Sequence, residues 1–194
     1  MKAQTLRRAA AFAAAVTVLF VLGCLNSATE PKVTKPRYPA TTNKDIVVSN
    51  LVLSYKDHNI DQYTKLLHLD YIWYNQNADV LRGAPAFYTR DQDIAQTRNL
   101  FLAADHNGSV SSDMWVDRLD LSIASASWMP VDTLEGNPCD DCWQTTREYY
   151  ITVEMTGGVM TLIGNDLVTL YVVPVTENGT KLYYLRRADD IRKP

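Results

Sequence analysis

The chain has 194 residues and a formal net charge of −3, with 46 % hydrophobic and 21 % charged residues. These proportions are typical of a globular domain. The acidic balance excludes the basic surface on which nucleic-acid binding depends, so we expect no nucleic-acid partner.

The N-terminus has the pattern of a bacterial lipoprotein signal peptide. Three basic residues precede an almost uninterrupted apolar run over 9–22, and Gly23 stands directly before Cys24. This run is shorter than the ~20 residues that a membrane-spanning helix needs. The sequence therefore predicts removal of residues 1–23 and a lipid on the thiol of Cys24. Two alternatives stay open: an uncleaved membrane anchor, or an ordinary secretory signal that happens to end in Cys.

The part after the signal peptide is long enough for one domain. Removing residues 1–23 would leave 171 residues, and the formal charge would move from −3 to −6 because the removed segment carries three positive charges. We expect the lipid to hold the protein at the bacterial cell envelope, facing the periplasm or on the cell surface. Residues 24–42 contain three prolines and no apolar period, which predicts a flexible tether before a domain at 43–194.

Helix signals come first in this domain. Thr42 followed by Asp45 indicates a helix start, and the helix is expected to run to about Lys56. Asn59 with Gln62 three residues later predicts a second, shorter helix. Both segments carry apolar residues at helical spacing.

A short aromatic strand over 71–74 separates these helices from a third one. Thr89 with Gln92 predicts the start of the third helix, and Asn107-Gly108 predicts its end. The residues expected to share one side of this helix are Ile94, Thr97, Arg98 and Phe101.

From Asp113 onward the apolar residues follow a period of two, which indicates β-strands. The clean alternation over 148–155 predicts one strand, and Gly157-Gly158 predicts a tight hairpin after it. One face of the first long strand is expected to carry Trp115, Leu119, Leu121 and Ile123.

The last part of the chain predicts two further strands. The segment 159–173 is strand-like, with a bulge or kink expected at 164–166. Asn178-Gly179 predicts a second hairpin before a final strand at 181–187. Helices first and a meander last favour an α+β domain over alternating βαβ units. We expect three N-terminal helices packed in a strongly bent antiparallel sheet, which forms a cone with one open end.

If Cys24 carries the lipid, two cysteines remain, Cys139 and Cys142, in a C-x-x-C spacing among Gly, Asn and Pro residues. Outside the cytosol such a nearby pair usually forms a disulfide. Free thiols and metal or redox chemistry stay open as alternatives. A redox pair normally begins a helix, and a zinc site would need two more ligands that no His or Cys cluster supplies.

The segments 48–55 and 59–67 read V-S-N-L-V-L-S-Y and N-I-D-Q-Y-T-K-L-L. They resemble the start of NTF2-like (SnoaL-like, cystatin-type cone) domains, which commonly read N-L-x-x-A-Y and D-x-x-x-Y-x-x-L-L here. Residues 89–101 resemble the third helix of that family, and 183–190 its closing strand. The resemblance covers about residues 43–190 and is closest to uncharacterised lipid-anchored members from bacterial envelopes. Two features depart from the pattern: Leu182 stands where Trp is frequent, and the cysteine segment is not general.

The resemblance implies a fold that hosts isomerases, dehydratases, cyclases, binding modules and structural subunits, so it does not fix the function. Its isomerase-like members use a pocket carboxylate with a Tyr or an acid as oxyanion donor, and its dehydratase-like members use a His with an acid. Neither residue set can be matched onto this chain. A homodimer is a further expectation from the resemblance.

Asp117 is the candidate carboxylate that the sequence offers. Its register places it on the same strand face as Trp115, where a buried acid would have a raised pKa. The alternatives are a bulge at Asp117-Arg118 that turns it outward, or a salt bridge with an Arg. The aromatic residues expected to line an apolar cavity beside it, or to fill that cavity completely, are Trp73, Trp115, Tyr149 and Tyr171.

The chain carries no Ser-His-Asp arrangement, no phosphate-binding glycine loop and no His/carboxylate metal spacing. We therefore expect no cofactor and no metal site, and no catalytic histidine. The sequence favours a lipid-anchored envelope protein whose non-catalytic domain binds a small apolar ligand or a protein partner. The alternative is an isomerase- or dehydratase-like enzyme in which Asp117 acts with a tyrosine on a small apolar substrate.

Overall fold

The chain folds as helices followed by long strands, as the sequence predicted. The computed structural model describes residues 37–158 and 161–193. Its helices are α2 (Lys44–Lys56), α3 (Ile60–Leu66), α4 (Asn77–Val80) and α5 (Arg90–Ala104), with 3-10 turns at Ser112–Met114 and Thr156–Gly158. Its strands are β1 (Leu67–Tyr74), β2 (Phe87–Thr89), β3 (Val116–Ile123), β4 (Met129–Leu134), β5 (Asn137–Met155), β6 (Thr161–Glu177) and β7 (Thr180–Ile191).

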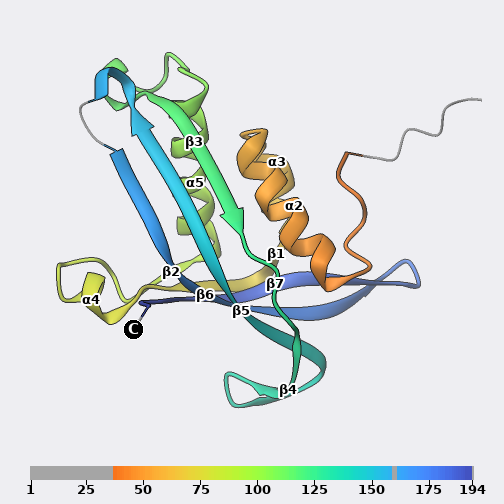
Figure 1. The fold of residues 1–194 in the computed structure, drawn as a ribbon. Coiled ribbons are helices and arrows are strands. Elements are labelled where there is room, and N and C mark those ends of the chain that lie inside the picture. Colours follow the sequence, from red (N-terminus) through yellow and green to blue (C-terminus); the bar gives the residue numbers. More distant parts are fainter. Residues whose placement is uncertain (1–36, 159–160, 194) are drawn as a thin grey trace, which may run out of the picture. The chain divides into compact units, whose positions relative to one another are not determined.

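The strands form one bent sheet, and α2, α3 and α5 pack against it (Figure 1). The order across the described sheet is β2-β1-β7-β6-β5-β3, and β4 pairs with the first part of β5. The expectation of an antiparallel sheet is wrong at one described pairing, because β1 and β7 run parallel and the sheet is mixed. Most of the domain separates β1 from β7, so the connection is long enough for a parallel pair.

Polar side chains start the helices close to the predicted positions. The Asn43 side chain caps α2, one residue after the predicted Thr42. The Asn59 side chain caps α3, as predicted. Thr89 and Gln92 form the predicted capping box at the start of α5. These caps fix where each helix enters the cone, and therefore where the side chains of its first turn lie.

Two hairpins depend on residues with left-handed backbone conformation. Asn178 and Gly179, between β6 and β7, have φ values of 49° and 78°, as expected for an Asn-Gly turn. Glu135 and Gly136, between β4 and β5, have φ values of 53° and 79°. The second hairpin was not predicted, because Glu-Gly is a weaker turn signal than Asn-Gly. The segment with the two cysteines is consequently a strand and not a loop.

Gly164 pairs regularly with β5, so of the bulge or kink predicted at 164–166, the bulge is wrong. Gly164 pairs with Ile151 of β5, and the described register shows no shift around it. A Cβ atom at Gly164 would lie 2.7 Å from Cγ2 of Ile151. The glycine therefore leaves room for the Ile151 side chain, a role that glycine often has inside strands.

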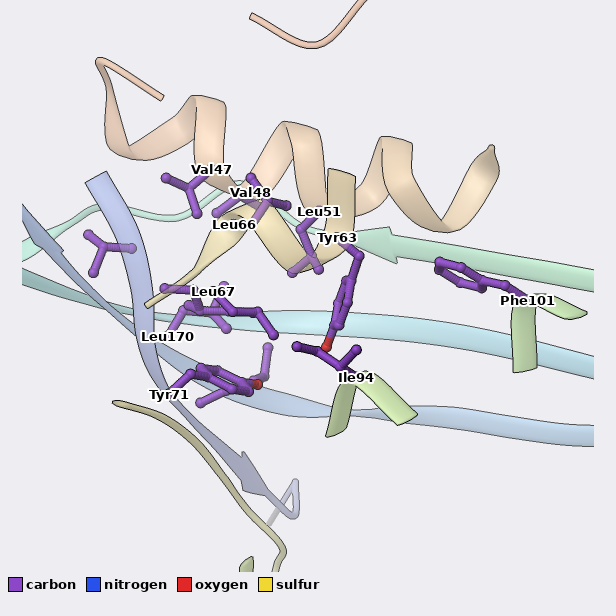
Figure 2. Packing of buried hydrophobic residues seen from close by; sticks show 14 of the residues in the cluster. Val47, Val48, Leu51, Tyr63, Leu66, Leu67, Tyr71, Ile94, Phe101 and Leu170 are labelled. Carbon is purple, nitrogen blue, oxygen red and sulfur yellow. The ribbon is translucent and has the colours of Figure 1, made fainter. Parts of the chain in front are cut away.

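The main hydrophobic core packs between the helices and the sheet (Figure 2). It draws on α2, α3, β1, α5 and β6, among other elements. Complete burial of one large apolar side chain stabilises a fold by roughly 1.5–3 kcal/mol. The core residues labelled in Figure 2 are Val47, Val48, Leu51, Tyr63, Leu66, Leu67, Tyr71, Ile94, Phe101 and Leu170.

A buried arginine joins α2 to β5. The Arg147 side chain is 5 % exposed, and its guanidinium lies 2.8 Å from the Asp45 carboxylate. The guanidinium also donates to the carbonyl oxygens of Ala124 and Ala126. The Trp128 indole donates to Asp45 at 2.9 Å. The hydrogen bonds from Trp128 and then from Arg147 lower the pKa of Asp45, so the carboxylate stays ionised in the folded protein.

Residues 37–42 are attached to the domain, so the predicted tether reached too far. The Tyr38 hydroxyl donates to the Asp57 carboxylate at 2.7 Å. The carbonyl oxygen of Pro39 accepts a hydrogen bond from the buried side chain of Asn50 at 2.8 Å. This segment satisfies a polar group of α2 that would otherwise be buried without a partner.

The signal peptide over 1–23, the lipid on Cys24 and the tether up to residue 36 lie outside the described residues. They stay predictions from the sequence. Within the described part of the chain, no helix combines the length and the apolar character needed to cross a membrane.

Candidate functional site

The space between the helices and β5 holds a cavity in two adjoining parts, which we call the inner and outer chambers. The inner chamber has a volume of about 80 Å³ and the outer chamber about 610 Å³. Together they fall in the range of small-molecule sites, roughly 300–1,000 Å³. The residues that line both chambers are Tyr55, Tyr63, Trp73, Tyr149 and Ile151.

The inner chamber is apolar. Its further lining residues are Leu51, Tyr71, Leu121, Ile123, Val168, Leu170 and Leu185. Burial raises the pKa of Tyr55 to about 12, and it raises the pKa of Tyr63 and Tyr71 well above the ordinary value. These three phenols are therefore neutral at physiological pH.

The outer chamber adds polar groups, most of them from one face of α5. This face carries Asp93 and the residues three, four and seven positions after it, which are Gln96, Thr97 and Leu100. Among the described lining residues of either chamber there is no Lys, Arg or His. The outer chamber is completed by Asn75 and Tyr88.

Asp93 places a carboxylate in the wall of the outer chamber. It lies in the first turn of α5, and the Tyr63 hydroxyl donates a hydrogen bond to its Oδ2 atom. Figure 2 shows the Tyr63 side chain extending from α3 toward Ile94 at the start of α5. Burial raises the pKa of Asp93 to about 6, although the Tyr63 hydrogen bond acts in the opposite direction. The group therefore titrates close to physiological pH.

A second carboxylate lies behind the aromatic wall. The Tyr149 hydroxyl donates to Oδ1 of Asp190 at 3.1 Å, and Gln76 approaches the other carboxylate oxygen at 3.5 Å. Burial raises the pKa of both Tyr149 and Asp190. On the same side of the cavity, the Trp73 indole donates to Oδ1 of Asn75 at 3.0 Å. The hydroxyl hydrogen of Tyr149 and the indole hydrogen of Trp73 are thus both donated to other side chains of the protein.

The structure brings together two of the four aromatic residues predicted to line a cavity. Trp73 and Tyr149 line both chambers, whereas Trp115 and Tyr171 line neither. Trp115 lies ahead of β3 and stacks on His106, with ring centroids 4.9 Å apart. Tyr171 packs against a small second hydrophobic cluster. Successive side chains of a strand point to opposite faces, and because the neighbouring Leu170 and Val172 are buried in the main core, Tyr171 points to the other face.

Asp117, the predicted carboxylate, lies outside the cavity. The pairing of β3 with β5 shifts register just before Arg118, so Asp117 leaves the face that carries Leu119. Its side chain is 47 % exposed, and it contacts Nε2 of His106 at 3.2 Å and the Thr156 hydroxyl at 2.8 Å. The expectation of a buried Asp117 is therefore wrong, and the alternative of a bulge that turns it outward is confirmed.

The three histidines lie outside both chambers. His58 follows α2 and contacts the Asp105 carboxylate at 2.6 Å, and His106 contacts Asp117 on the surface. His68, near the start of β1, lies 3.7 Å from Asp70. No described geometry places a histidine against a molecule held in the cone.

A disulfide joins Cys139 and Cys142 within β5. Between them, Asp141 has a φ of 57°, and its carboxylate accepts hydrogen bonds from Lys181 at 2.8 Å and from Tyr183 at 2.7 Å. The Lys181 bond is the largest cause that lowers the pKa of Asp141 to about 2. The charge of Asp141 is thus balanced by Lys181, and these bonds join this part of β5 to β7.

A second hollow, of about 560 Å³, lies against residues 38–41, α3 and the ends of β6 and β7. Its lining mixes charges of both signs, including Lys65 and Glu177, and contains the 81 % exposed Leu69. The cone cavity has the features of a ligand site to a greater degree, because aromatic side chains line both of its chambers beside a few polar groups of α5.

The sequence matches no described protein family and no curated protein. The structure, however, is similar to many solved structures. A hexachlorocyclohexane dehydrochlorinase (LinA) type 2 has a TM-score of 0.50 and 6 % identity, over 76 % of this chain and 81 % of that chain. The beta subunit of a putative aromatic-ring-hydroxylating dioxygenase from Novosphingobium aromaticivorans has a TM-score of 0.51 and 14 % identity, over 79 % and 89 %.

A conserved protein from Planctomyces limnophilus has a TM-score of 0.51 and 11 % identity, over 77 % of this chain and 93 % of that chain. At such identities the similarity shows the fold alone. The bent sheet with helices packed against it, together with these neighbours, shows that the chain has the NTF2-like α+β cone fold, as the resemblance in its sequence predicted.

Proposed function

We propose that the cone binds one small, largely apolar molecule, with Asp93 at the polar end of the site. The observation that supports this most is the cavity itself, in which an outer chamber of about 610 Å³ adjoins an apolar inner chamber. The aromatic side chains supply contact area with little conformational freedom, and the polar groups of α5 supply orientation. The binding is non-catalytic in this proposal.

Binding can be tested with the neutral fluorescent probe N-phenyl-1-naphthylamine. We expect its emission to rise and shift to the blue when it enters the cone. Leu100→Trp, which fills part of the outer chamber, should weaken binding at least tenfold, or roughly 1.4 kcal/mol. Leu81→Trp is the matched control, because Leu81 is 89 % exposed and lines neither chamber. Equal weakening by both variants, or no binding by the unmodified protein, contradicts the proposal.

We also propose that a lipid on Cys24 holds this domain at the bacterial envelope. The support is the sequence alone: a short apolar run that ends directly before a cysteine. Mass spectrometry of protein from its native host should find an acylated Cys24 at the N-terminus, and Cys24→Ser should release the protein from the membrane fraction. An unmodified Cys24 in native material contradicts the anchor. The protein partner and the homodimer stay predictions.

A catalytic role is the second candidate, now with Asp93 in place of Asp117. The observation that favours it is a carboxylate whose pKa is raised to about 6 inside a cavity, since a general base works best when its pKa lies near the working pH. Asp93 would take a proton from a substrate held against Tyr63 and Tyr149. Deuterium exchange into 2-tetralone, followed by NMR, tests this. Exchange that is equally fast without protein, or with Asp93→Asn, excludes this chemistry for that substrate.

A further inference from the structure

We infer that the molecule bound in the cone is a compact organic cation, a quaternary ammonium group or similar, held between aromatic rings and the Asp93 carboxylate. This inference rests on the binding function proposed above and names the class of ligand. Three features of the cavity carry it: the aromatic wall, the bound polar hydrogens, and the charges of the lining.

The aromatic wall is suited to a cation. Tyr55, Tyr63, Trp73 and Tyr149 line both chambers and come from four different elements, so rings surround the space from several sides. A cation within about 6 Å of a ring centre is attracted by the negative face of the ring, and the attraction grows when water is excluded. Quaternary ammonium groups suit such a site because they have no N–H group, and therefore need no hydrogen-bond acceptor from the protein.

Three polar hydrogens of the wall are already bound to side chains of the protein. The Tyr63 hydroxyl donates to Asp93, and the Tyr149 hydroxyl donates to Asp190 at 3.1 Å. The Trp73 indole donates to a neighbouring side chain at 3.0 Å. A phenol that donates its proton to a carboxylate has a more electron-rich ring. Such a wall disfavours an anion and favours a cation.

The charges of the lining point the same way. Asp93 has the neutral Tyr63 hydroxyl as its partner, and the described lining of both chambers holds no basic side chain. Other carboxylates of the described chain are paired differently: Asp45 binds Arg147, and Asp141 binds Lys181. A desolvated carboxylate is costly unless an opposite charge compensates it. A cationic ligand supplies that charge.

The same arrangement makes binding depend on pH. The titratable groups around Asp93 are Tyr55 on α2, Tyr63 on α3, Tyr71 on β1, Tyr88 on β2 and Tyr149 on β5, with Asp190 of β7 behind Tyr149. Burial raises the pKa of Asp93 to about 6, so the ionised form that attracts a cation dominates above this pH. At pH 5 Asp93 is ionised in roughly a tenth of the molecules. The apparent dissociation constant should therefore be roughly tenfold higher than at pH 7.5, which means weaker binding.

The test compares two molecules of nearly the same shape, choline and 3,3-dimethylbutan-1-ol, which differ in a positive nitrogen against a neutral carbon. Isothermal titration of the full purified protein at pH 7.5 should show that choline binds at least tenfold more tightly. Asp93→Asn, which keeps the shape of the side chain, should reduce this preference by roughly threefold or more, and the preference that remains is the contribution of the aromatic rings. Asp91→Asn, on the same helix turn with a 94 % exposed side chain, should leave the preference unchanged.

The outcomes separate this inference from the proposal on which it rests. If the neutral alcohol binds as tightly as choline, while N-phenyl-1-naphthylamine still binds, the cation is wrong and the ligand site stands. If none of the three binds, both are wrong. A choline preference that is as large in Asp93→Asn as in the unmodified protein, or that does not weaken at pH 5, contradicts the role of the carboxylate. Because Asp93→Asn is expected to be more stable than the unmodified protein, failure to fold would also contradict the reasoning.

Discussion

Replacing Asp93 by asparagine tests the burial of this carboxylate through the stability of the fold. The Tyr63 hydroxyl can still donate to the amide oxygen, so the change removes the ionisable group and little else. Burial raises the pKa of Asp93 from 3.8 to about 6 in the folded protein. Between these values the folded chain holds a proton that the unfolded chain has released. The stability of the unmodified protein therefore falls as the pH rises from about 4 to about 6, and this contribution is constant above that.

The size of the effect follows from the same two values. The difference between 3.8 and about 6 corresponds to roughly 3 kcal/mol. Water in the outer chamber screens the carboxylate in part, so we expect about 2 kcal/mol. Asp93→Asn should therefore unfold with a free energy about 2 kcal/mol higher than that of the unmodified protein at pH 7.5. At pH 4 the two proteins should agree to within about 0.5 kcal/mol.

Urea unfolding, followed by tryptophan fluorescence at pH 4 and pH 7.5, measures both numbers. Asp91→Asn is the matched control, because its side chain is 94 % exposed in the same helix turn and should change the free energy of unfolding by less than about 0.5 kcal/mol. A loss of stability in Asp93→Asn at pH 7.5, or an equal gain at both pH values, would refute the assignment of Asp93 as a partly buried acid without a cationic partner among the described residues.

Three further predictions concern the frame around the cavity. Asp45→Ala leaves the buried Arg147 without its carboxylate, so the free energy of unfolding should fall by about 2 kcal/mol at pH 7. Because the pKa of Asp45 is lowered in the folded state, this difference from the unmodified protein should shrink as the pH falls below the ordinary Asp value; a constant difference contradicts it. Gly164→Ala should lower the free energy of unfolding, measured in urea, by about 1–3 kcal/mol, because the new Cβ atom meets Ile151. In the background of Ile151→Ala the same change should cost less. If the effects of the two substitutions simply add, the close approach is contradicted. Deleting residues 37–42 together with everything before them should lower the Tm by several degrees relative to a chain that keeps them, and an unchanged Tm would restore the longer tether.

The parts of the fold that sequence analysis predicted well depend on neighbouring residues. The caps at Asn59 and at Thr89 with Gln92 join groups three residues apart, so the sequence alone contains the interaction. The Asn178-Gly179 hairpin is equally local. In each case the residue type determines the backbone conformation without help from distant parts of the chain.

The errors arose where pairing with another strand decides the outcome. Asp117 follows the alternating pattern of β3, but the register shift against β5 turns it to the surface. Gly164 resembled a bulge, yet it is needed because Ile151 on the neighbouring strand occupies the space of a side chain. Strand register depends on two segments at once, so one segment cannot predict it.

The position of Asp93 on α5 can be read from the sequence as a sign that it faces the cone. It stands four residues before Thr97 and seven before Leu100, so it continues the stripe on α5 that faces the cone. What the sequence could not supply is the partner, because Tyr63 lies 30 residues away on another helix. An acid on the inner stripe of an amphipathic helix is therefore a better candidate than an acid in a strand whose register is unknown.

The stability of Asp93→Asn also separates a ligand site from a filled scaffold. If the cone only supported the fold, asparagine at position 93 would accept the Tyr63 hydrogen bond and avoid the cost of a desolvated charge. The chain instead keeps an acid in a wall of aromatic rings, beside a chamber of about 610 Å³. Proteins commonly retain groups that lower stability where binding or chemistry needs them. A measured gain of stability in Asp93→Asn would therefore support a site in which something positively charged, or a proton in transfer, meets this carboxylate.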